Sequence, residues 1–255
     1  MAITVYPLTE ADIPDAIEII QVAFAEDPYF KWVFDEKKFN KKRNYGSLKA
    51  RCLWGIGNAI FHVAREDDQD VSSTQSPSPS QSQETEIETK PGKILGVSCW
   101  LPPSPPTAPE SWYSYYQSWL LYLRQGLNNI WHLGRGGLNV RRYYIWKERQ
   151  AEAQESVWDD EQGYYFCNIV AVRPEAQGLG VGRKLFEAIT KKADEEGRRC
   201  YLESSRDEPN VRIYEKLGFE MKKVMECRDT EVSSGGKDGG VCMLYCMVRG
   251  PKISS

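Results

Sequence analysis

Three kinds of feature are scarce or missing in this 255-residue chain. It holds only two histidines, His62 and His132, and neither lies in a motif that would support a zinc site or a Ser/His/Asp triad. The net charge is −3, so the chain has no basic excess with which to bind nucleic acid through its phosphates. We therefore expect neither a bound metal nor a nucleic-acid partner.

Long apolar runs are also absent. No run approaches the ~20 residues that cross a bilayer, and the first residues lack the basic and apolar segments of a signal peptide. The seven cysteines are odd in number, scattered, and without a Cys-x-x-Cys pair, which is typical of buried free thiols in a reducing compartment. We expect a cytoplasmic protein with no membrane partner; a nuclear location stays open, and the oligomeric state cannot be read.

The composition is that of an ordinary globular protein, and the length favours one domain over residues 1–255. Within it, residues 66–92 are rich in Ser, Gln, Pro and acidic side chains, and they predict a disordered loop between two neighbouring antiparallel strands. Residues 102–160 begin with prolines and continue as an aromatic-rich helical insertion.

The spacing of apolar residues predicts alternating helices and strands in an α/β protein with a mixed sheet. Pro14 fits only the first turn of a helix, so Asp12 is the expected N-cap of the first one. Residues 28–34 are aromatic and irregular. Strands are expected at 3–7, 58–65, 93–101, 164–172, 199–204, 219–227 and 241–249. Helices are expected at 13–24, 41–55, from 111 to the glycines at 134–137, and at 140–154, 180–196 and 210–217.

The most informative segment follows the buried strand 164–172. After a turn at Arg173-Pro174, residues 177–182 read Gln-Gly-Leu-Gly-Val-Gly and open directly into an amphipathic helix. Glycines let the backbone approach a ligand, and the first turn of a helix presents unpaired N–H groups that attract a phosphate. Arg183 and Lys184 add positive charge. The segment predicts a phosphate or pyrophosphate site, against the alternative of a purely structural connection.

The glycine spacing separates this segment from two better-known phosphate motifs. A dinucleotide-binding turn needs Gly-x-Gly-x-x-Gly, whereas the spacing here is Gly-x-Gly-x-Gly. A P-loop needs Gly-Lys-Ser/Thr, which does not occur.

Two motifs carry a resemblance to a known family. Residues 170–182 resemble motif A of the GNAT superfamily of acyl-CoA N-acyltransferases, Gln/Arg-x-x-Gly-x-Gly/Ala, with Gln177, Gly180 and Gly182 in the fixed positions. Residues 210–219 (Asn-Val-Arg-Ile-Tyr-Glu-Lys-Leu-Gly-Phe) resemble its motif B. The likeness covers 164–249 well and 3–65 loosely, but not 66–92 or most of 102–160. Residues 202–205, followed by Asn210, resemble the puromycin-N-acetyltransferase-like branch.

The resemblance implies a fold and a co-substrate. The fold is a GNAT-like mixed, mostly antiparallel sheet of about seven strands, flanked by helices, with a splay between strands 4 and 5 (164–172 and 199–204). The co-substrate is acetyl-CoA, bound without a metal. Its pantetheine arm would contact Val170, Ala171, Val172 and Asn210, and its pyrophosphate would contact Gln177, Gly178, Leu179, Gly180, Val181, Gly182, Arg183 and Lys184.

The implied reaction is direct attack of an amine, from a small molecule or peptide, on the thioester, with Tyr214 as general acid for the departing thiolate. Glu203, at the end of a strand, is our candidate base, alone or through water. The alternative for Tyr214 is a tyrosine that only packs in the core. The alternative for Glu203 is a solvated or salt-bridged carboxylate at the end of a strand. Cys167 and Cys200 fit strand packing better than a covalent intermediate. Two other functions stay open: a non-catalytic acyl-CoA sensor and a dinucleotide-binding oxidoreductase.

An aromatic stripe in the insertion has two interpretations. Its members recur at steps of three and four residues, which places them on one helix face. Core packing is the first interpretation, and the wall of an acceptor pocket is the second. The stripe comprises Trp112, Tyr116, Trp119, Leu123, Leu127 and Ile130.

Overall fold

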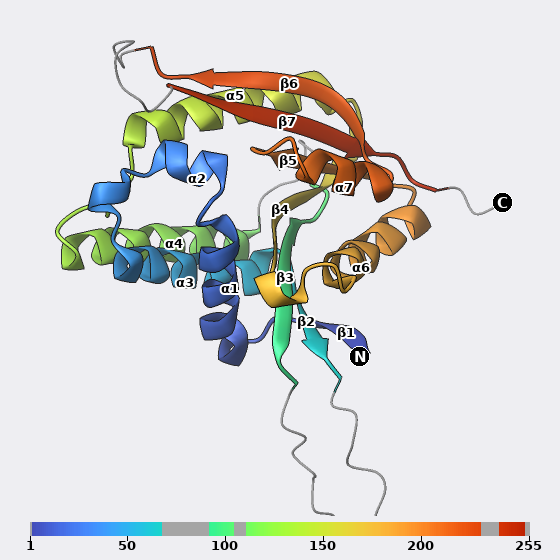
Figure 1. Cartoon of the computed structure of the whole chain (residues 1–255), viewed down its shortest axis with the longest axis horizontal. Helices are drawn as coiled ribbons and strands as arrows, with labels where there is room; N and C mark the ends of the chain where they lie inside the picture. The colour runs from blue at the N-terminus through green and yellow to red at the C-terminus, as the bar shows by residue number, and fades with distance from the viewer. Residues whose placement is uncertain (1, 68–91, 105–110, 231–239, 253–255) are drawn as a thin grey trace, which may run out of the picture.

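Seven strands form one mixed sheet in the computed structural model, which describes residues 2–67, 92–104, 111–230 and 240–252. The spatial order is β1-β2-β3-β4-β5-β7-β6, and every neighbouring pair is antiparallel except β4 and β5 (Figure 1). The predicted fold class is confirmed. The strands are β1 (Ile3–Pro7), β2 (Ile60–Glu66), β3 (Ile94–Leu101), β4 (Tyr164–Val172), β5 (Arg199–Ser204), β6 (Glu220–Arg228) and β7 (Val241–Arg249).

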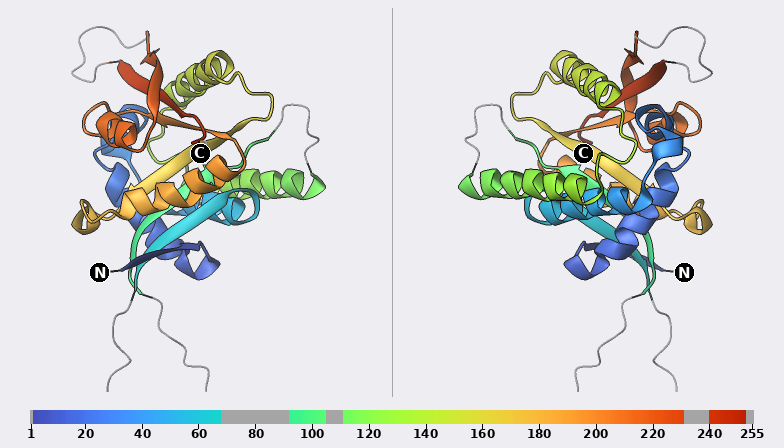
Figure 2. Two further views of the ribbon diagram at one scale, coloured as in Figure 1. Left: turned by 90° about the vertical axis from the view of Figure 1, so that its right-hand side faces the viewer. Right: turned by 90° about the vertical axis from the view of Figure 1, so that its left-hand side faces the viewer.

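The helices cover both faces of this sheet (Figures 1 and 2). α1, α2 and α5 pack on one face, α6 and α7 pack on the other, and α3 lies between α1 and α4. They are α1 (Ile13–Phe24), α2 (Pro28–Val33), α3 (Lys41–Asn58), α4 (Trp112–Trp131), α5 (Val140–Val157), α6 (Val181–Glu195) and α7 (Asn210–Lys216). The expected loop at 66–92 falls almost entirely on residues 68–91, which lie outside the described part of the chain.

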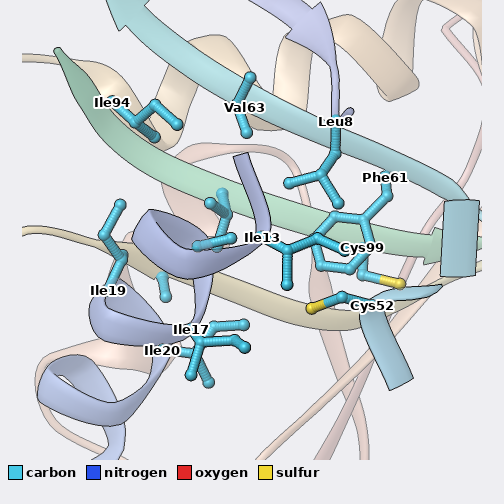
Figure 3. Close-up of a cluster of buried hydrophobic side chains, with 13 residues drawn as sticks. Leu8, Ile13, Ile17, Ile19, Ile20, Cys52, Phe61, Val63, Ile94 and Cys99 are labelled. Carbon is cyan, nitrogen blue, oxygen red and sulfur yellow. The ribbon is translucent and has the colours of Figure 1, made fainter. Parts of the chain in front are cut away.

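The apolar face of α1 lies on the central strands. Ile13 and Ile17 are buried against Val63 of β2 and Cys99 of β3 (Figure 3). On the opposite face of the sheet, Leu185 of α6 is fully buried. The two helices therefore pack on opposite faces of the central strands. Each buried Ile or Leu contributes about 1.5–3 kcal/mol of hydrophobic stabilisation.

Two local predictions near the N-terminus need correction. Asp12 does occupy the N-cap position of α1, but its carboxylate accepts from the Thr9 backbone N–H and hydroxyl and pairs with Arg65, so it does not cap the helix. The segment expected to be irregular forms α2. Its N-cap, Asp27, accepts a hydrogen bond from the Tyr29 backbone N–H at 2.9 Å, an Asp-Pro start that the sequence already contained.

The core-packing interpretation of the aromatic stripe is wrong. All six of its side chains are exposed, and they lie along α4 on the side away from the protein. The rings also line two open hollows, but these hollows are formed by residues of α4 alone. The pocket interpretation therefore gains no support either, because no residue of the predicted site reaches the stripe's hollows.

Candidate active site: an opening between parallel strands

The sheet opens where β4 and β5 stop pairing. The last paired residues are Cys167 and Leu202, whereas β4 continues to Val172 along β3 alone. The register between β3 and β4 shifts at this point, so that Asn168 is an extra, exposed residue in β4. Such a bulge bends its strand and increases the local twist. The bend turns the end of β4 away from β5 and leaves the 168–172 edge that faces β5 without a strand partner.

The glycine-rich turn lies beyond the end of β4 and remains open to solvent. Gly178 and Gly180 have φ values of 80° and 84°, a conformation that favours glycine, and a Cβ atom at either would meet nothing within 4 Å. Gly180 is the N-cap of α6 and supplies no side chain to its first turn. Backbone N–H groups at Val181, Gly182 and Arg183 therefore face a site suited to an anion.

Charged side chains flank this turn as the sequence predicted. Arg183 is exposed and its Nε lies 3.0 Å from Glu187 Oε1, one helical turn along α6. Lys184 is also exposed. Because a surface ion pair of this kind contributes little energy, Arg183 is available to a phosphate at small cost.

α7 brings Asn210 and Tyr214 to the same side of the sheet. Asn210 Nδ2 lies 3.4 Å from Ser204 Oγ at the end of β5. The Tyr214 ring packs between Phe186 and Phe219, with centroid distances of 5.6 and 6.4 Å, and its hydroxyl has no hydrogen-bond partner among the described residues. Burial raises the pKa of Tyr214, and neighbouring Cys167 and Asp27 raise it further. The hydroxyl therefore keeps its proton at neutral pH.

Glu203 lies on the opposite face of β5, toward α5. Its carboxylate accepts hydrogen bonds from Tyr201 Oη at 2.7 Å, from Gln154 Nε2 at 3.2 Å and from Gln150 Nε2. Burial raises the pKa of Glu203, and the donors from Gln150, Tyr201 and Gln154 partly oppose that shift. A carboxylate with a raised pKa is a stronger base than one in water.

The opening lies between these two environments. Leu202 and Ser204 turn toward α6 and α7, whereas Tyr201 and Glu203 turn toward α2 and α5. In an unbroken sheet the two faces would be sealed from each other. Backbone pairing between β4 and β5 ends beyond Cys167, with Tyr214 on one face of the sheet and Glu203 on the other.

Asp27 is a candidate that sequence reasoning missed. It is buried, and Ser205 Oγ lies 2.8 Å from each of its carboxylate oxygens. The contact with Ser205, which directly follows β5, places Asp27 beside the end of that strand. The Asp-Pro helix start was readable in the sequence, but the contact with Ser205 spans 178 residues and has no local signal.

The cysteines near the opening are unsuited to nucleophilic catalysis. Cys167 and Cys200 are buried and not disulfide-bonded. Burial raises the pKa of Cys200 to about 12 and also raises that of Cys167. Because the thiolate is the nucleophile, both groups are inert at neutral pH. The interpretation of Cys167 and Cys200 as packing residues agrees with this burial.

A sheet opened between two parallel strands beside an exposed glycine-rich turn agrees with the resemblance to acyl-CoA N-acyltransferases that the two sequence motifs carry. Comparisons with known proteins agree. A sequence model of the acetyltransferase (GNAT) domain matches residues 140–221. An uncharacterized N-acetyltransferase of Schizosaccharomyces pombe is 32% identical over 164 residues, which are 64% of this chain and 60% of that protein. Over these residues the chain is similar to GNAT N-acetyltransferases, and it matches that curated relative over about three fifths of the relative's length.

A solved structure shares the fold of this chain. Arylalkylamine N-acetyltransferase 2 from Aedes aegypti superposes with a TM-score of 0.57 at 15% identity, over 99% of this chain and 100% of that one. A structure described as histone acetyltransferase HPA2 and related acetyltransferase, from Corynebacterium glutamicum, has a TM-score of 0.48 at 18% identity, over 100% and 99% of the two chains. No helix in the described part of this chain is long and apolar enough to cross a membrane.

Proposed function

We propose that this protein is an acetyl-CoA-dependent N-acetyltransferase that moves an acetyl group to an amine of a small molecule or peptide. The observation that carries the proposal is the opening between β4 and β5, with an exposed anion-binding turn beside it and Tyr214 at its side. The amine attacks the thioester directly, and no covalent enzyme intermediate forms.

Donor binding follows from the backbone. The pyrophosphate of acetyl-CoA would bind the N–H groups of residues 177–182, with Arg183 and Lys184 adding charge. The pantetheine amides would pair with the free edge of Val170, Ala171 and Val172, as an added strand does. Asn210 would donate to the same arm.

Tyr214 supports the departure of the thiol. When the amine nitrogen bonds to the acetyl carbonyl carbon, the C–S bond breaks and its electron pair passes to sulfur. The raised pKa of Tyr214 keeps a proton available on its hydroxyl, and that proton goes to the thiolate. The acylated nitrogen then loses one proton through water, which restores the Tyr214 hydroxyl and leaves a neutral amide. A backbone N–H near Val170 would stabilise the developing oxyanion.

Glu203 is the proposed base on the acceptor face. An amine that arrives as an ammonium ion must lose a proton before it can attack, and the raised pKa of Glu203 suits that task. A water molecule between Glu203 and the amine would serve as a relay. The branch similar to puromycin N-acetyltransferases and a cytoplasmic location stay predictions from the sequence.

A non-catalytic acyl-CoA sensor is the second candidate. One observation favours it: the Glu203 carboxylate already accepts three hydrogen bonds. These donors occupy the oxygens that would accept a proton from an incoming amine, and they come from Gln150, Gln154 and Tyr201. A sensor would keep the donor site and lack turnover.

Two measurements separate these functions. The first is thermal unfolding with CoA, which should stabilise the protein by about 2.7 kcal/mol at one hundred times its dissociation constant. The second is thiol release from acetyl-CoA with a panel of arylalkylamines, polyamines, aminonucleosides and peptides. Binding with release for at least one amine supports the transferase. Binding without release across the panel supports the sensor, and stabilisation by NADH but not by CoA would exclude both.

A further inference from the structure

The outward side of α4 is the largest exposed apolar feature among the described residues. We call it the α4 face. Trp112 and Tyr122 are 88% and 75% exposed, and the helix is ~30 Å long at 1.5 Å per residue. Contiguous apolar patches of this size mark interaction sites on soluble proteins. The α4 face comprises Trp112, Tyr115, Tyr116, Trp119, Tyr122, Leu123, Leu127 and Ile130.

The opposite side of α4 is polar, and it faces the protein. Gln125 exchanges hydrogen bonds with Ser47 of α3, at 2.8 and 3.0 Å, and Asn129 Oδ1 accepts from Arg43. A helix on the surface of a soluble protein ordinarily does the reverse, burying its apolar stripe and solvating its polar one. The sequence of α4 is therefore suited to an apolar environment outside this chain.

Charge indicates the nature of that environment. Residues 37–65 and 111–147 contain no aspartate or glutamate, although the whole chain carries a net charge of −3. These stretches hold both α3 and α4. α3, which packs directly behind α4, adds the exposed cations Lys42 and Lys49. The α4 face thus lies in an acid-free, basic part of a protein that is acidic overall.

We propose that the α4 face docks on an anionic lipid surface. Tryptophan and tyrosine favour the headgroup level of a bilayer, leucine and isoleucine favour the acyl boundary just below it, and cations strengthen binding to anionic lipids. The α4 face and the basic residues of α3 supply all three. The helix lies on the membrane and does not cross it. This partner departs from the sequence-based expectation of no membrane contact, which considered only membrane-spanning segments.

A second copy of the chain is the competing occupant. In a two-fold dimer the α4 face would meet itself, because such an interface places the same patch on both sides. That arrangement would also bring two acid-free, basic regions together, and like charges across an interface oppose association. Charge therefore favours an anionic partner over a copy of the same chain.

Vesicle co-sedimentation of the full chain tests the proposal. The probes are phosphatidylcholine vesicles with and without about 30% phosphatidylserine, a content that gives a strongly negative surface. We expect partitioning at least about tenfold stronger on the anionic vesicles, since each surface cation contributes roughly a factor of five. No partitioning, or equal partitioning on both vesicles, would overturn the proposal.

Matched variants connect the binding to the α4 face. Tyr122→Ser with Leu127→Ser should reduce partitioning at least about tenfold, and Lys42→Gln with Lys49→Gln should remove most of the preference for anionic vesicles. The control is Tyr6→Ser with Val224→Ser, two exposed side chains of β1 and β6 whose loss should leave partitioning unchanged. All six positions are exposed, so folding should be preserved, which circular dichroism checks.

Light scattering without lipid tests the competing occupants. The proposal predicts no dimer that depends on the α4 face. A dimer that dissociates in the Tyr122→Ser, Leu127→Ser variant, together with absent vesicle binding, would assign the α4 face to a second copy. Vesicle binding that survives this double substitution would overturn the proposal as well.

Discussion

α6 and α4 are both amphipathic helices, yet they use their apolar faces in opposite ways. α6 buries Leu185 and Ile189 in the sheet and carries the anion-binding turn at its N-terminus. α4 buries polar contacts against α3 and turns Trp119 and Leu123 to the outside. The difference teaches that apolar periodicity identifies which residues share a face, but not what that face contacts. Substitutions should therefore damage function and folding around α6 and spare both on α4.

The largest expected effect concerns the tyrosine that packs on α6. Tyr214→Phe should lower kcat by roughly 10²–10⁴-fold, because the thiolate loses its acid, while acetyl-CoA affinity stays nearly unchanged. Steady-state thiol release measures the first and calorimetry the second. The matched control, Tyr116→Phe on α4, should leave kcat unaltered. Equal turnover in the two variants would remove Tyr214 from the mechanism.

Core packing should separate the two helices in stability. Leu185→Ala should lower the free energy of unfolding by about 2–5 kcal/mol, because Leu185 is fully buried and its loss leaves a cavity. Leu123→Ala on α4 should change it by less than about 0.5 kcal/mol. Urea unfolding followed by fluorescence measures both values. A large loss of unfolding free energy in Leu123→Ala would mean that the α4 face is covered in solution by another part of the chain or by a second copy.

Two glycines test the anion-binding turn. Gly180→Val should weaken CoA binding by roughly tenfold or more, since its positive φ disfavours a side chain and the new side chain would occupy the phosphate approach. Gly126→Val, in the middle of α4 and also with nothing near its added Cβ, should leave CoA binding intact. Calorimetric titration with CoA compares them. Unchanged affinity in Gly180→Val would place the pyrophosphate elsewhere.

The smallest effect is expected at the proposed base. Glu203→Gln should lower kcat/KM by about tenfold. It should change the dependence of the rate on pH more than it changes the maximal rate. Burial raises the pKa of Glu203, so the wild-type rate should rise with pH through that raised value as the carboxylate forms. The Gln variant should lose this dependence when a weakly basic amine is the acceptor.

The exposed Glu155→Gln on α5 serves as the control for that profile. If Glu203→Gln keeps the wild-type profile and Asp27→Asn abolishes it, the base is Asp27, the buried carboxylate bonded to Ser205.

The glycine-rich turn and the position of α7 were predictable because their signals are local. The glycines of residues 177–182 specify their own turn, and Asn210 and Tyr214 lie within one short motif of α7. The hydrogen-bond partners of Glu203 were not predictable. Glu203 meets Gln150 across 53 residues, and such a contact exists only once α5 has packed beside β5. α2 and the environment of α4 were missed for related reasons: a brief helix has little periodicity, and an exposed stripe has the same spacing as a buried one.

The extra residue at Asn168 keeps the end of β4 bent away from β5. Cys167 lies opposite Trp100 and Ile169 lies opposite Cys99, so that Asn168 has no partner residue on β3. Deleting Asn168 would leave both pairs in register, because Cys167 and Ile169 would then alternate between the two faces as in a regular strand, and Ile169 would stay in the cluster beneath α1. The shortened strand would therefore lose its bend without losing its core contacts, and a protein that folds but no longer binds the donor is the expected result.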